Sequence, residues 1–120
     1  MTGLMIKGDA ATGKVIGRTV VRLPSEVQEF VQRHVLFIST KRTASGMMVR
    51  FADHWLPQCV VVLAEDAMRG KWAVDIVAHE IAHAYADHPH EESREDMEAD
   101  ADTLAVRWGF RSKPKGSSAR

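Results

Sequence analysis

The sequence has 120 residues, of which 45% are hydrophobic, and this suffices for one compact domain with a continuous core. Its 16 basic and 16 acidic residues cancel, so the net charge gives no reason to expect a polyanionic partner or an anionic membrane surface. The single cysteine, Cys59, excludes an intramolecular disulfide. No apolar run approaches the ~18 residues of a membrane span, and the first residues do not resemble a secretory signal. We therefore expect a soluble, cytoplasmic protein.

The first half of the chain predicts a strand, a helix and a hairpin. Residues 15–23 are rich in β-branched side chains and stop before Pro24, which is typical of a strand. Ser25 is placed to cap a helix over residues 26–34, where apolar residues recur at helical spacing. Two short apolar segments, 35–38 and 47–51, flank a stretch of turn composition and predict a β-hairpin.

The second half predicts one more strand and two helices. The apolar run 59–63 predicts a strand. Residues 72–87 contain no glycine or proline and are apolar nearly all round, so they predict a buried helix. A last helix is expected from Ser93 to Gly109. The order of elements predicts an α+β fold in a single domain of residues 1–110, followed by a flexible basic tail of residues 111–120.

The predicted buried helix contains a metal-binding pattern, His79-Glu80-Ile81-Ala82-His83. Residues four apart differ by only about 40° around a helix, so the two imidazoles can converge on one ion. Glu80 lies about 60° from His83, close enough to reach a water on that ion without binding the metal itself. Two histidines and a glutamate on an apolar helix are costly to bury without a partner such as a metal.

A catalytic zinc site needs a third protein ligand and one position open to water. On the last helix, Glu98 and Asp102 lie four residues apart at the edge of an apolar stripe. Packing this stripe against the buried helix turns Glu98 towards the histidines, while Asp102 is placed to accept a hydrogen bond from the second nitrogen of a ligating imidazole. Glu95 and Asp96 are the rival third ligands, although they point further from the stripe.

Together these two motifs resemble the gluzincin group of zinc peptidases, whose second motif is Glu-x-x-Ala-Asp-x-x-Ala and is matched here by residues 98–105. The short gap between the motifs is similar to that of ImmA/IrrE-type and other minimal phage and bacterial metallopeptidase-like proteins. The resemblance covers about residues 60–110. It implies a minimal zincin fold, with a small mixed sheet, a buried active-site helix and a C-terminal helix that carries the third ligand.

The resemblance also implies a function. Zn²⁺ would be held by His79, His83 and Glu98, with Asp102 supporting a ligating histidine. Peptide-bond hydrolysis would proceed by a metal-activated water with Glu80 as the general base. A peptide or protein substrate would lie extended beside the strand at residues 59–63, taken as an edge strand. His88 and His90 are candidate oxyanion stabilisers.

Two alternatives belong to other functional classes. The first is a binding or inhibitor module that retains the zincin fold and its metal ligands but uses them to bind a protein partner. The second is a structural zinc site with no catalytic role. Structural sites are usually closed by four ligands and rich in cysteine, which disfavours the second alternative because Cys59 is the only thiol. The basic tail supplies weak support for contact with nucleic acid.

Overall fold

The computed structural model describes residues 4–41, 46–50, 59–86 and 94–111. Four strands form one sheet: β1 (Met5–Lys7), β2 (Val35–Thr40), β3 (Gly46–Arg50) and β4 (Cys59–Ala64). Their order is β1-β2-β4-β3, with β1, β2 and β4 parallel and β3 antiparallel to β4. The strand predicted over residues 59–63 is confirmed, and it lies inside the sheet.

The predicted hairpin is wrong in its pairing, although both of its strands exist. Strand β4 lies between β2 and β3 and pairs with each of them, Val61 opposite Phe37 on one side and Met48 on the other. The reason is the apolar character of β4, where Val61 and Leu63 are fully buried. A strand with a continuous apolar sequence is stabilised at the centre of a sheet rather than at its edge. For the same reason, the expectation that residues 59–63 form an edge strand is wrong.

The strand predicted over residues 15–23 is also wrong, because residues 15–20 belong to helix α1 (Ala10–Val20) and a turn follows them. The buried side chains of α1 recur at a spacing of three and four residues, which is the helical period: Thr12, Val15, Ile16, Thr19 and Val20. The carboxylate of Asp9 caps the helix by accepting a 3.0 Å hydrogen bond from the backbone N–H of Thr12. Burial of one helical face thus outweighs the β-propensity of its branched residues.

The other helices follow the predicted order. Helix α2 spans Ser25–His34, and its N-cap is Pro24, so the prediction of Ser25 as the cap is wrong by one residue. The carbonyl of Pro24 accepts hydrogen bonds from the N–H groups of Val27 and Gln28. A short 3₁₀ helix, η1 (Ala67–Arg69), leads into α3 (Ala73–Ala86), the predicted buried helix.

Helix α4 (Arg94–Arg107) is the predicted last helix. It ends at Gly109, which has a φ of 98°, a conformation that glycine adopts without strain. The N–H of Phe110 reaches back to the carbonyl of Ala105 at 3.0 Å, and the N–H of Gly109 binds that of Val106. This is the backbone pattern of a glycine-terminated helix. The expected cap at Ser93 lies outside the described residues.

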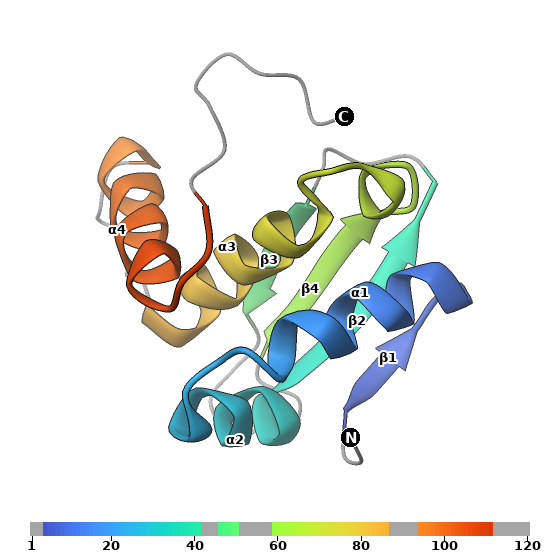
Figure 1. The fold of residues 1–120 in the computed structure, drawn as a ribbon, viewed down its shortest axis with the longest axis horizontal. Coiled ribbons are helices and arrows are strands. Elements are labelled where there is room, and N and C mark those ends of the chain that lie inside the picture. The colour runs from blue at the N-terminus through green and yellow to red at the C-terminus, as the bar shows by residue number, and fades with distance from the viewer. Residues whose placement is uncertain (1–3, 42–45, 51–58, 87–93, 112–120) are drawn as a thin grey trace.

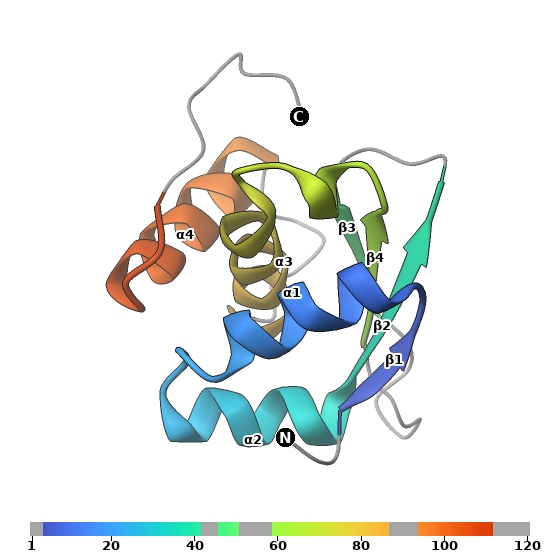
Figure 2. The ribbon, with the colours of Figure 1, turned by 45° about the vertical axis from the view of Figure 1, so that its right-hand side comes forward.

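The described elements form layers (Figure 1). Helices α1, α2 and α3 lie on one face of the sheet, and α4 packs on α3 away from the strands. Figure 2 shows the same arrangement from the side, with the sheet at one edge and α4 at the other. The core lies between the sheet and the first three helices, and its largest fully buried side chains include Phe37, Ile16, Leu63 and Ile81. The protein is therefore a small α+β domain with a mixed sheet.

Candidate metal centre

Helix α3 presents His79 and His83 side by side. Their rings lie edge to face with centroids 4.7 Å apart, and their Nε2 atoms are separated by 3.2 Å. The His79 side chain is 19% exposed and that of His83 is 12% exposed, so both imidazoles are accessible while the helix below them is buried. The four-residue spacing places the two nitrogens where the sequence predicted them.

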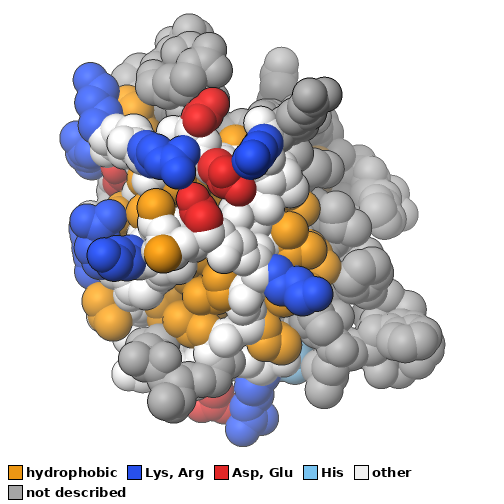
Figure 3. Space-filling view, turned by 90° about the vertical axis from the view of Figure 1, so that its right-hand side faces the viewer, with side chains coloured by type: hydrophobic (Ala, Val, Ile, Leu, Met, Phe, Trp, Pro, Cys, Tyr) orange, Lys and Arg blue, Asp and Glu red, His pale blue; other side chains and the backbone are white. Residues whose placement is uncertain are grey.

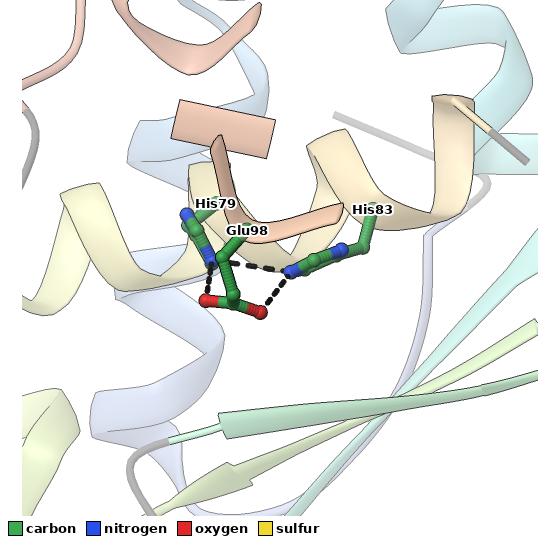
Figure 4. Close-up of side chains that lie close together, drawn as sticks. All are labelled: His79, His83 and Glu98. Carbon is green, nitrogen blue, oxygen red and sulfur yellow. Dashed lines mark hydrogen bonds and ion pairs between the residues drawn. The ribbon is translucent and has the colours of Figure 1, made fainter. Parts of the chain in front are cut away.

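Helix α4 brings a carboxylate to this pair (Figure 4). Glu98 Oε1 lies 3.0 Å from His79 Nε2, and Glu98 Oε2 lies 2.8 Å from His83 Nε2. Among the described residues, His79, His83 and Glu98 form a group whose ligand atoms lie within 4.8 Å of one another and which could hold a metal ion. The side chains of the rivals Glu95 and Asp96 lie outside the described residues.

Asp102 contacts the other nitrogen of His79. Its Oδ1 lies 2.9 Å from His79 Nδ1, one helical turn beyond Glu98. A carboxylate only accepts hydrogen bonds, so His79 Nδ1 carries the proton and its N–H donates a hydrogen bond to Asp102. In a neutral imidazole, Nε2 then carries a lone pair directed at Glu98 and His83. This is the arrangement expected from the sequence for Asp102.

The geometry of these atoms suits a cation. The lone pair of His79 Nε2 faces a Glu98 oxygen 3.0 Å away, and two acceptors at this distance repel unless a proton or a metal ion lies between them. In a tetrahedral site with bonds of about 2.0–2.1 Å, ligand atoms are separated by about 3.3 Å. The N–N distance of 3.2 Å and the N–O distances of 3.0 and 2.8 Å are close to this value. Two imidazoles and one carboxylate therefore fit one ion, with room in its coordination for a further ligand.

Opposing influences act on the pKa of Glu98. Burial is the largest single one and favours the neutral acid. When no metal is bound and both imidazoles are protonated, the charges of His79 and His83 and the hydrogen bonds that their rings then donate together outweigh it. The pKa of Glu98 is therefore held below its ordinary value. The carboxylate remains charged, as a metal ligand must, at pH values where an isolated glutamate begins to take up a proton.

This shift predicts a pH-dependent contribution to stability in the metal-free protein. A carboxyl group with a lowered folded-state pKa adds stability that is present above its unfolded-state pKa of about 4.3 and is lost as the pH falls through the folded-state value. In the presence of a chelator at about pH 6, we expect the natural chain to unfold at a higher urea concentration than Glu98→Gln. This difference should disappear at about pH 3. An advantage that persists undiminished at about pH 3 would contradict the assignment of the shift.

The remaining predicted site residues are placed as follows. Glu80 lies on α3 next to His79, and the residue is 9% exposed. Tyr85 packs edge to face against Phe30 and Trp108. The candidate oxyanion stabilisers at positions 88 and 90 lie outside the described residues.

A polar contact at the other end of α3 was not predicted from the sequence. The side chain of Asp75 is 7% exposed. It accepts a 2.8 Å hydrogen bond from the backbone N–H of Arg111 and forms an ion pair with the Arg111 guanidinium at 3.1 Å. The available signal was Asp75 itself, an acid in the first turn of a largely buried helix. Arg111 was expected to begin the flexible tail, whose other residues, 112–120, lie outside the described part of the chain.

No family model, curated protein or solved structure matches this chain. The assignment of a function therefore depends on the geometry of the site and on the two sequence motifs. Among the described helices, none has the length and apolar character needed to cross a membrane.

Proposed function

We propose that this protein is a zinc-dependent metallopeptidase of the gluzincin type, in which His79, His83 and Glu98 hold the zinc ion and Glu80 is the general base. One observation carries the proposal. Glu98, fifteen residues after His83, lies against the Nε2 atoms of both histidines in the positions of metal ligands. The two imidazoles and one carboxylate form a donor set of catalytic zinc sites.

Zinc, when bound, acts as a Lewis acid on a carbonyl oxygen and increases the acidity of a coordinated water. The protein residues position the ion and move protons. Asp102 holds the proton of His79 on Nδ1 and so keeps Nε2 free for the metal. Glu80, one residue from His79 and shielded from bulk water, accepts the proton of the attacking water and passes it to the leaving amine.

We place the substrate peptide along β3. Strand β4 pairs on both sides and cannot accept a further strand, whereas β3 lies at the end of the sheet order and pairs only with β4 among the described strands. Helix α3 packs against β3 as well as β4, which brings this sheet edge close to the helix that carries the histidines. An extended peptide can add to such an edge through main-chain hydrogen bonds.

A peptide or protein substrate also agrees with the charge distribution. On the face that Figure 3 shows, basic, acidic and hydrophobic side chains are interspersed rather than segregated into one basic area. Recognition of nucleic acid depends on many phosphate contacts from clustered Lys and Arg. This face lies on the side of the molecule away from α4, and the preference for a polypeptide over a polyanion rests on the balance of 16 basic and 16 acidic residues in the chain.

Metal removal tests the proposed function. Purified protein is expected to contain about one zinc per chain by elemental analysis and to cleave members of a mixed peptide library, detected by mass spectrometry. A chelator should abolish the cleavage, and added zinc should restore it. Cleavage that continues at the same rate in the metal-free protein would contradict the proposal, as would a chain that takes up no zinc after supplementation.

A further inference from the structure

Helix α4 packs on α3 through small buried side chains. Its only fully buried side chains among those described are Ala101 and Ala105, and its main packing partner is α3. Helix α3 likewise buries alanines, among them Ala78 and Ala82. Methyl groups allow two helices to approach closely but present shallow ridges and grooves. Such a surface does little to prevent one helix from rotating or sliding along the other.

Two arginines hold the residues that follow α4. The guanidinium of Arg22 donates a 2.9 Å hydrogen bond to the carbonyl of Gly109 and lies 4.3 Å above the ring of Phe110. The guanidinium of Arg111 lies 4.6 Å above the ring of Trp72 and binds the carboxylate of Asp75. The end of α4 is therefore attached to the start of α3 and to the turn after α1.

The attachment lies at the opposite end of the helix pair from the metal centre. His83 contacts Glu98, His79 contacts Asp102, and Asp75 contacts Arg111, so α3 and α4 run antiparallel. A slip of α4 by a single residue displaces Glu98 by about 1.5 Å along the helix axis. This is half of the 2.8–3.0 Å separation that places the Glu98 oxygens against the histidines.

We propose that Arg111 is a positioning residue for the metal centre. Through Asp75 and Trp72 it fixes the position of α4 along α3 and thereby holds the Glu98 carboxylate against His79 and His83. The Arg111 side chain is 64% exposed, but Asp75 is only 7% exposed and accepts hydrogen bonds from both the backbone and the guanidinium of Arg111, so the contact has a defined geometry. The inference rests on the proposed metal site but not on peptidase activity.

The test measures binding of Co²⁺ by the full chain, because this ion reports affinity and coordination geometry through its visible absorption. Arg111→Ala is expected to weaken Co²⁺ binding about 10-fold, the effect typical of residues that orient metal ligands, and to alter the absorption of the saturated site. Arg107→Ala is the matched control, since Arg107 is an exposed arginine at the same end of α4. Arg111→Lys keeps the charge but not the planar guanidinium, so it should lose less Co²⁺ affinity than Arg111→Ala. It replaces Arg111→Ala in the test if that variant does not fold.

A double-mutant cycle separates positioning from general stabilisation. If Arg111 acts through Glu98, then Arg111→Ala should cause no further loss of Co²⁺ affinity in a Glu98→Ala background. An equal loss in both backgrounds would overturn the positioning role, and so would a natural chain and an Arg111→Ala variant with the same affinity and spectrum. A natural chain that binds no metal would overturn both this inference and the proposed function. Metal binding without peptide cleavage would overturn the peptidase activity alone.

Discussion

The variant Glu80→Gln is expected to keep its zinc and to lose peptide hydrolysis by roughly 10²- to 10⁴-fold, the range attributed to general acid–base catalysis. Glutamine has nearly the same shape as glutamate but cannot accept a proton. His79, His83 and Glu98 are unchanged in this variant, so the ion stays bound. The measurement is the zinc content of the variant together with its rate of cleavage on a peptide identified with the natural chain.

Glu26→Gln is the matched control, because Glu26 is exposed in the first turn of α2, far from α3 in sequence. It should cleave the peptide as the natural chain does. Full activity of Glu80→Gln would exclude Glu80 as the base. If, in addition, the protein binds a partner through this face, that result would favour the alternative of a binding module.

The variant His83→Ala is expected to weaken zinc binding by more than about 100-fold, which exceeds the usual effect of outer-shell residues. Removal of one imidazole leaves a single nitrogen and one carboxylate, too few to form the three-ligand site. Because the ion binds the folded chain, its loss also affects stability. Zinc at about 100 times its dissociation constant stabilises the natural chain by roughly 2.7 kcal/mol, and this gain should vanish in the variant.

Thermal unfolding with and without added zinc measures the second effect. His34→Asn is the matched control, because His34 contacts the ring of Phe30 and lies outside the metal cluster. This control should still unfold at a higher temperature when zinc is added. A rise of equal size in His83→Ala would show that the ion binds elsewhere on the chain.

Local pattern was sufficient to predict α2, α3, α4 and β4, since each has a clear period or an uninterrupted apolar run. It was insufficient for α1. Gly13 and Gly17 lower the helix propensity of that segment, and its branched residues favour a strand. The spacing of Val15, Ile16, Thr19 and Val20 carried the correct signal, since these positions share one helical face. Strand β1, with three residues, was too short to predict.

The pairing of strands depends on contacts between distant segments, and here local reasoning failed. Turn composition between β2 and β3 favoured pairing between neighbours in the sequence. The fully apolar sequence of β4 was the better guide, because such a strand gains most when both of its edges are paired. Burial at the sheet centre therefore outweighed the preference for a local turn.

The candidate site was more accessible to sequence reasoning than the sheet. The spacing of His79 and His83 depends only on helical geometry, and the apolar stripe on α4 indicated which acid faces α3. The structure accordingly brings Glu98 and Asp102 to the two histidines. Asp75 and Arg111 are 36 residues apart in the sequence. Their contact depends on the direction that the chain takes after α4 ends, and no periodic pattern in the sequence predicts this direction.

Completion of the site depends on the packing of α4. Helix α3 packs against α1, β3, β4 and η1, whereas α4 packs mainly on α3. The two nitrogen ligands therefore belong to a helix that is held from several sides, while the carboxylate belongs to a helix with one main partner. Docking of α4 on α3 is the contact that brings the third ligand to the other two.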